Sequence, residues 1–87
     1  MIALRTHITA TPTGNGMVLL DTRSGKYWQL NATGTLILSD LLAGASMTEA
    51  ATRLTLRHPA AARRADDDVH ALLQQLRAAH LLIQDRP

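Results

Sequence analysis

The chain has 87 residues and no cysteine, so we expect one compact domain, residues 1–87, with no disulfide, zinc-thiolate site or thiol nucleophile. Its hydrophobic fraction of 46% against 18% charged residues excludes the composition of an intrinsically disordered chain. The net charge of +2 is only weak support for nucleic-acid binding.

The first third of the chain predicts three short antiparallel strands. Residues 7–11 are rich in threonine, and the proline and glycines of residues 12–16 supply a turn before the apolar run Met17–Asp21. A second turn, in which Gly25 is available for a positive φ, leads into Tyr27–Leu30.

The second turn also predicts how the last two strands pair. If Asp21 lies opposite Lys26 across a four-residue loop, Leu19 lies opposite Trp28 on the face that we expect to be the core. Tyr27 then lies on the opposite face of the sheet, together with Gln29.

Two helices with recognisable ends should follow. Asn31 is a good N-cap for the first, and Gly44 supplies its C-terminal stop. The second begins with a capping box formed by Ser46 and Glu49, and it ends at residues 58–59 because a residue before proline is driven out of the helical region.

The third predicted helix is the longest, covering about residues 61–79. Its early turns hold three aspartates, residues 66–68, and Arg77 lies near its end, which matches the helix dipole. Residues 81–84 either add a final short strand or tuck under the core. The order of strands and helices predicts an α+β fold of winged helix-turn-helix type, with a three-stranded antiparallel sheet followed by three helices.

The residues expected of an enzyme or a metal site are missing from the sequence. The four histidines are scattered, none forms an i,i+4 pair on a helix, and the aspartate run lacks the spacing and glycine of a calcium loop. No phosphate-binding loop is present. We therefore expect no catalysis, no metal and no cofactor.

The same sequence gives an expectation for location. The N-terminal residues lack a signal-peptide pattern, and no stretch approaches the ~20 apolar residues needed to span a bilayer. These features predict a cytoplasmic protein that does not bind membranes.

The stretch Asp-Thr-x-x-Gly-x-Tyr-Trp-x-Leu-Asn, residues 21–31, resembles the PqqD-like family. Its members are precursor-recognition elements for ribosomally made, modified peptides, and the subtype most similar to this chain is the free-standing leader-binding protein of lasso-peptide biosynthesis. The resemblance extends over the helical half. His80 stands where glycine is common in the family, which leaves the end of the third helix open to differ here.

The resemblance implies that an extended leader peptide adds as a strand to the free edge of residues 26–30 and rests against the third helix. The implied binding residues are Lys26, Tyr27, Trp28, Gln29, Leu30, Val69, Leu72, Leu73 and Leu76. For Trp28 two placements fit, in the groove or in the core. The implied partners are the precursor's leader and a separate transglutaminase-like cysteine protease, which removes the leader before a cyclase closes the ring.

Two other functions remain compatible with the sequence. A winged-helix DNA-binding domain fits the element order and the basic pI, and Arg63 and Arg64 support it, but the aspartates that follow would repel phosphates. A dimerising antitoxin-like or adaptor protein without a peptide ligand is the third possibility.

Overall fold

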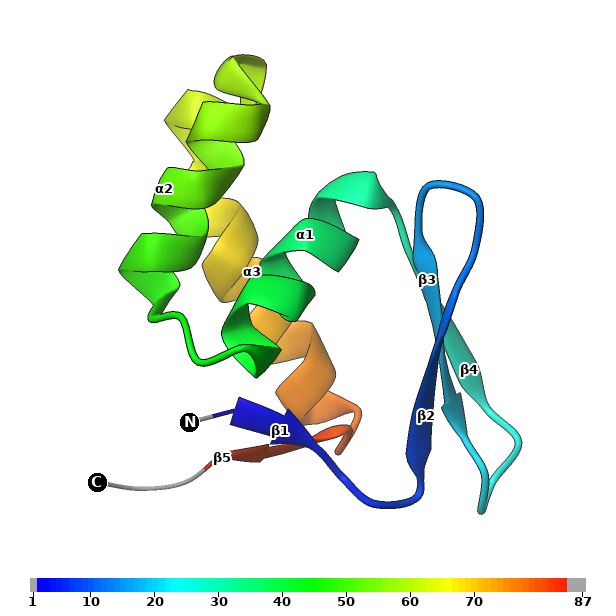
Figure 1. The fold of residues 1–87 in the computed structure, drawn as a ribbon. Coiled ribbons are helices and arrows are strands. Elements are labelled where there is room, and N and C mark those ends of the chain that lie inside the picture. Colours follow the sequence, from blue (N-terminus) through cyan, green and yellow to red (C-terminus); the bar gives the residue numbers. More distant parts are fainter. Residues whose placement is uncertain (1, 85–87) are drawn as a thin grey trace.

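The computed structural model describes residues 2–84. Figure 1 shows a sheet beside a group of helices, with a two-stranded ribbon at their base. In chain order the elements are β1 (Ile2–Leu4), β2 (Ile8–Pro12), β3 (Met17–Asp21), β4 (Tyr27–Leu30), α1 (Ala32–Leu42), α2 (Met47–Arg57), the 3-10 helix η1 (Pro59–Arg64), α3 (Ala65–Ala78) and β5 (Leu82–Gln84). The three-stranded sheet followed by three helices confirms the predicted α+β fold class.

The sheet has the order β2-β3-β4, and both pairs are antiparallel. The predicted register of the second hairpin is confirmed, because Leu19 pairs with Trp28 and the N–H of Asp21 donates to the carbonyl oxygen of Lys26 at 2.9 Å. Leu19 is completely buried, so the face that carries it is the core face.

The ribbon joins the two ends of the described chain. β1 pairs antiparallel with β5, and the N–H of Arg5 donates to the carbonyl oxygen of Leu81 at 3.0 Å. The sequence analysis did not predict β1 and left β5 as one of two alternatives. Three residues are too few to give a clear strand signal in the sequence. Whether they form a strand depends on pairing with a segment at the far end of the chain.

The predicted ends of the first two helices are confirmed. Asn31 Oδ1 accepts a hydrogen bond from the N–H of Gly34 at 2.8 Å, which caps α1. Ser46 and Glu49 form both bonds of the capping box of α2, each at 3.0 Å. The two caps fix where each helix begins, and the Asn31 cap also fixes where the chain leaves the sheet after β4.

The third helix differs from its prediction at its start. α3 begins at Ala65, and the preceding residues from Pro59 to Arg64 form the 3-10 helix η1. Proline is tolerated at the first position of such a turn because it needs no backbone donor there. The predicted continuous helix from residue 61 is therefore wrong, while the placement of three aspartates in the first turn is confirmed.

α3 ends in a Schellman motif centred on His80. The N–H of Leu81 donates to the carbonyl oxygen of Leu76 and the N–H of His80 donates to that of Arg77, both at 3.0 Å. His80 has φ 59°, the left-handed conformation that usually belongs to glycine. The helix therefore ends with the backbone that a glycine would adopt, although the residue is histidine.

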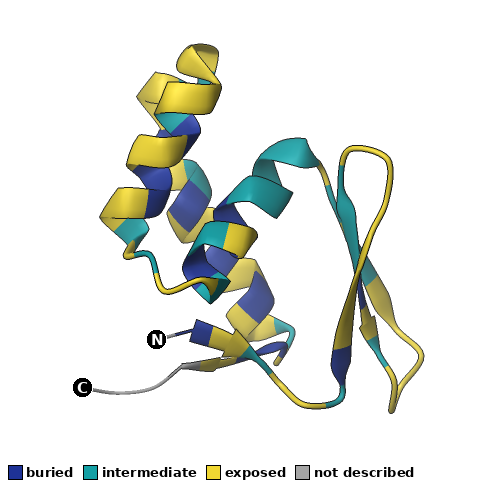
Figure 2. Cartoon of the chain, in the orientation of Figure 1, coloured by how far each residue is buried: buried dark blue, intermediate teal, exposed yellow. Residues whose placement is uncertain are grey.

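The core lies between the helices and one face of the sheet, as the buried segments in Figure 2 indicate. Its largest completely buried side chains are all aliphatic: Leu19, Ile37, Leu38, Leu41, Leu54, Leu73, Leu81 and Val69. Met17, Trp28 and Leu30 are partly buried and pack against this cluster from the sheet. Within residues 2–84, no helix combines the length and the apolar character that crossing a membrane requires.

Candidate functional site: the open edge of the sheet and the groove beside it

β4 is an edge strand whose outer side is unpaired. Within residues 2–84 it pairs only with β3. Because Lys26 accepts its bond from Asp21, the backbone of Lys26 points toward β3, and the alternation of a strand turns Tyr27 and Gln29 outward. The N–H and C=O groups of these two residues are thus available to another extended chain.

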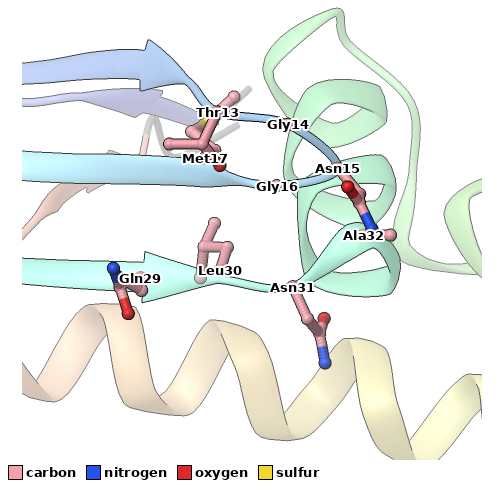
Figure 3. Close-up of a pocket in the computed structure, with 9 residues that line it drawn as sticks. All are labelled: Thr13, Gly14, Asn15, Gly16, Met17, Gln29, Leu30, Asn31 and Ala32. Carbon is pink, nitrogen blue, oxygen red and sulfur yellow. The ribbon is translucent and has the colours of Figure 1, made fainter.

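A groove of about 470 Å³ runs along this edge, between β4 and α3. Figure 3 shows α3 lying along β4 on the side away from β3. The groove is lined mainly by apolar side chains, with two glutamines among them: Trp28, Gln29, Leu30, Leu72, Gln75, Leu76, Ala78 and Ala79. Such a lining favours apolar side chains, and the glutamine amides can orient a polar backbone.

The groove continues at both ends. A pocket of about 350 Å³ shares Leu72 and Gln75 with it and extends toward Asn31 at the start of α1. A pocket of about 550 Å³ shares Trp28 and the last residues of α3 and extends toward the β3–β4 loop. An elongated ligand could therefore contact the protein over the full length of β4.

Another pocket, of about 590 Å³, lies at the β2–β3 loop. Figure 3 shows that it is bordered by Gly14, Asn15 and Gly16 of this loop and by the end of β4. It contains no ionisable side chain. Its volume comes from an open loop. The apolar groove is the better candidate binding site, because it adjoins unpaired strand backbone.

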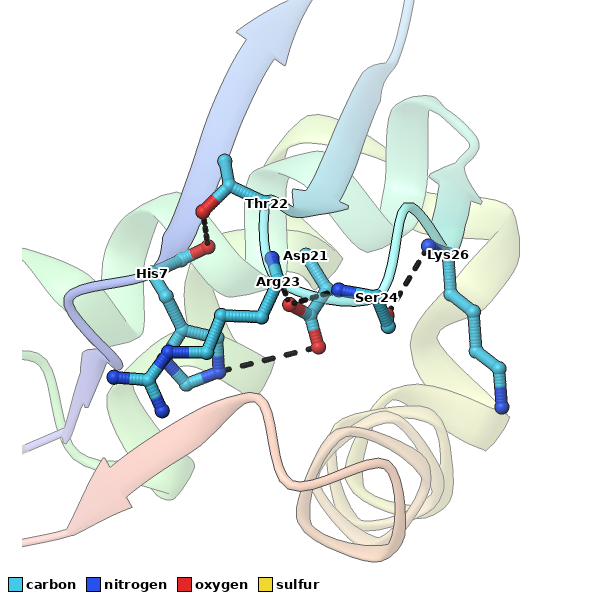
Figure 4. Close-up of polar contacts among 6 residues, drawn as sticks. All are labelled: His7, Asp21, Thr22, Arg23, Ser24 and Lys26. Carbon is cyan, nitrogen blue, oxygen red and sulfur yellow. Dashed lines mark hydrogen bonds and ion pairs between the residues drawn. The ribbon is translucent and has the colours of Figure 1, made fainter.

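The β3–β4 loop is fixed by Asp21. Its Oδ1 accepts hydrogen bonds from the N–H of Arg23 at 2.8 Å and from that of Ser24 at 3.2 Å, and its Oδ2 lies 3.9 Å from His7 Nε2 (Figure 4). The bond from Arg23 is the main reason that the pKa of Asp21 is lowered. The carboxylate is thus charged and holds the position at which β4 begins.

The structure brings five of the nine predicted site residues together in the central groove: Trp28, Gln29, Leu30, Leu72 and Leu76. Lys26 lines the adjoining pocket at the loop end. Trp28 satisfies both predicted placements, since it lines the groove and also packs against the core.

The other three predicted residues lie elsewhere. Val69 and Leu73 are each only 1% exposed and belong to the core. Tyr27 is 64% exposed and lies opposite Leu20, on the face of the sheet turned away from the core, so it can offer its backbone to the groove but not its side chain.

The sequence analysis missed three groove residues at the end of the third helix: Gln75 and Ala78 of α3 and its C-cap residue Ala79. A helical signal exists for Gln75 and Ala79, because residues 72, 75, 76 and 79 share one side of a helix. The prediction used only the large apolar residues of the helix. It therefore left out the glutamine and alanines that lie beside them.

The groups that the site offers are suited to contacts with an extended chain. Among the residues that the structure describes, no three His, Cys, Asp or Glu side chains lie close enough together to hold a metal ion. The groove itself offers apolar surface, two amide side chains and the outward backbone of β4.

Comparisons with known proteins agree on one family. The family model "Coenzyme PQQ synthesis protein D (PqqD)" matches residues 16–82. A solved structure described as lasso peptide synthetase B1 complexed with the leader peptide is 40% identical, with 95% of this chain and 98% of that chain covered and a TM-score of 0.85.

A second solved structure, TbiB1 in complex with the TbiA(beta) leader peptide, is 21% identical. It covers 97% of this chain and 98% of its own, with a TM-score of 0.81, and at this identity it supports the fold alone. A search of curated proteins finds no match.

Proposed function

The chain belongs to the PqqD family, and from this membership we propose that it binds the leader segment of a lasso-peptide precursor as an added strand beside β4. The observation that carries the proposal is the unpaired edge of β4 next to an apolar groove. The 40% identity to a synthetase B1 that was solved with its leader peptide supports it further. In this role residues 1–87 act as one peptide-binding domain that does no chemistry on its ligand.

Strand addition divides the work between backbone and side chains. The outward N–H and C=O groups of Tyr27 and Gln29 would hold the leader's backbone, each bond adding about 0.5–1.5 kcal/mol net. Alternate leader side chains would then point into the groove beside Trp28, Leu72 and Leu76. The backbone bonds supply affinity for any extended chain, and the groove selects which chain binds.

The proposed partner beyond the leader is a separate transglutaminase-like cysteine protease, which cuts the leader while this chain presents it. Leu20 and Tyr27 form an exposed cross-strand pair on the outer face of the sheet, 37% and 64% exposed. Because this face lies away from the groove, it could contact a protease while the leader is bound. The genomic neighbourhood tests the pathway: we expect a short precursor gene beside genes for such a protease and for an asparagine-synthetase-like cyclase.

Strand addition is tested with the leader peptide of the 40%-identical synthetase B1 as the probe. Trp28 is the only tryptophan and lines the groove, so its emission should change on titration. Gln29→Pro removes an outward N–H that an edge strand does not need for its own pairing, and should weaken binding by about two- to twelvefold while the domain stays folded.

Gln29→Ala is the matched control, because it removes the same side chain and keeps the N–H. The proline variant must bind more weakly than the alanine variant, with circular dichroism confirming that both are folded. Equal affinities for the two variants, or amide resonances at residues 26–30 that stay unmoved at saturating peptide, would rule out strand addition.

A further inference from the structure

We propose that the loop end of the groove is a subsite for an acidic side chain of the leader, whose carboxylate is bound by Lys26, Arg5 and His80. The inference rests on the proposed leader binding and adds the charge of one leader position to it. The pocket of about 550 Å³ at this end is lined by residues from four regions that meet here: Arg5, His7, Asp21, Ser24, Lys26, Trp28, Ala78, Ala79 and His80.

This pocket continues the apolar groove and is not separate from it. Trp28, Ala78 and Ala79 line both. A leader strand that fills the groove beside Trp28 therefore has its next side chains in the pocket, within reach of Lys26. Figure 4 shows the Lys26 side chain extending from the end of the β3–β4 loop toward the side on which α3 lies.

The charges in the pocket are unequal. Lys26 and Arg5 carry positive charges, and neither has an ion-pair partner among residues 2–84. Asp21 is the only carboxylate in the lining, and it is already held by two backbone N–H groups of its own loop. Two cations without an ion-pair partner among residues 2–84 thus line the pocket, together with one carboxylate that is already bound by its own loop.

The C-terminus of α3 would repel an anion bound in this pocket, because a helix carries roughly half a negative charge at this end. Its last turn, however, is closed by three N–H donors, from Ala79, His80 and Leu81, which bond to carbonyl oxygens of the preceding turn. The two positive charges exceed the sum of this partial charge and the full negative charge of Asp21 by about half an elementary charge, so the total at the pocket still favours a carboxylate.

The backbone conformation of His80 supports the acidic subsite independently of the charges of Lys26 and Arg5. A residue other than glycine in the left-handed conformation is strained, and such strain is often kept where the side chain has a use. Here the strained residue lines the same pocket as Lys26 and Arg5. The imidazole N–H can donate to a carboxylate oxygen that the two cations attract.

The position of the acidic residue follows from the direction of pairing. β4 runs from Tyr27, which follows Lys26 of the loop, to Leu30 at its end. A leader strand that pairs antiparallel, the more stable arrangement, runs the opposite way. Its C-terminal side then reaches the pocket, so the acidic residue should follow the segment that pairs with Tyr27 and Gln29.

The experiment scans charge along one peptide. Each position of the leader peptide of the 40%-identical synthetase B1 is replaced in turn by Glu, Gln or Lys, and affinities are measured by competition against a labelled parent peptide. At one position after the paired segment, Glu should bind about two- to fivefold more tightly than Gln, and Lys more weakly than Gln. The preference should shrink as salt is added.

Variants of the protein locate the preference. Lys26→Glu should invert the order so that Lys binds best, and His80→Gly should reduce the ratio between Glu and Gln. Arg57→Gln is the matched control: it removes one positive charge at the end of α2, outside the groove, and should leave the ratio unchanged.

The outcomes separate the two proposals. If the peptides bind but no position prefers Glu, or if Lys26→Glu keeps the wild-type order, the acidic subsite is wrong and leader binding stands. If the parent peptide itself does not bind, the proposed function fails and the subsite fails with it.

Discussion

Replacing His80 by glycine should make the protein more stable. An L-residue in the left-handed conformation costs roughly 1–2 kcal/mol relative to the right-handed one, and glycine adopts it without that cost. Glycine in turn loses more freedom on folding, by roughly 0.5–1 kcal/mol. The difference leaves a net gain of about 0.5–1 kcal/mol for His80→Gly, at the residue with φ 59°.

Thermal unfolding followed by circular dichroism measures this gain. For a domain of this size, 1 kcal/mol corresponds to roughly 4–8 °C in Tm, so the midpoint should rise by about 2–8 °C. His80→Ala is the control, because alanine loses the imidazole and keeps the strain, and it should give no increase.

Gly25→Ala offers the reverse case. Gly25 has φ 77° and open space around its missing side chain, so alanine there adds strain without a clash and should lower the midpoint. If His80→Gly is no more stable than His80→Ala, the strain at His80 is absent. The acidic subsite would then lose the support that it takes from the strain at His80.

Four further outcomes are expected. Leu73→Ala should destabilise by about 2–5 kcal/mol, because Leu73 is 1% exposed, whereas Leu56→Ala should change little at 76% exposure; urea unfolding compares them. Gly16→Ala should destabilise more than Gly14→Ala in the same assay, because a Cβ at Gly16 would collide with a carbonyl oxygen of β4 and one at Gly14 meets open space. Since loop N–H groups lower the pKa of Asp21, its contribution to stability is present above its ordinary pKa and is lost as the pH falls through the lower folded value; the melting temperature should drop below about pH 4 and drop less in Asp21→Asn. Any DNA binding should be insensitive to sequence and lost with added salt; a sequence-selective complex at ~0.2 M salt would revive the winged-helix alternative.

The site could be predicted in part. The turn at residues 22–26 gave the register of β4, and with it the identity of the edge residues, because pairing across a short loop is a local property. The apolar stripe on the third helix included Leu72 and Leu76, which line the groove in the structure. It could not separate them from Val69 and Leu73, because all four lie on one apolar stripe and only the packing of α3 decides which part is covered.

The sequence by itself determined the features whose chemistry is local: the hairpin register, the asparagine cap of α1 and the capping box of α2, each made by residues within a few positions of one another. Only the tertiary structure decided features that join distant segments. β1 exists because β5 lies beside it, and the pocket at the loop end of the groove exists because Arg5, Lys26 and His80 meet there from three separate parts of the chain. Spacing along a sequence carries no information about such meetings, because they depend on how the completed helices pack against the sheet.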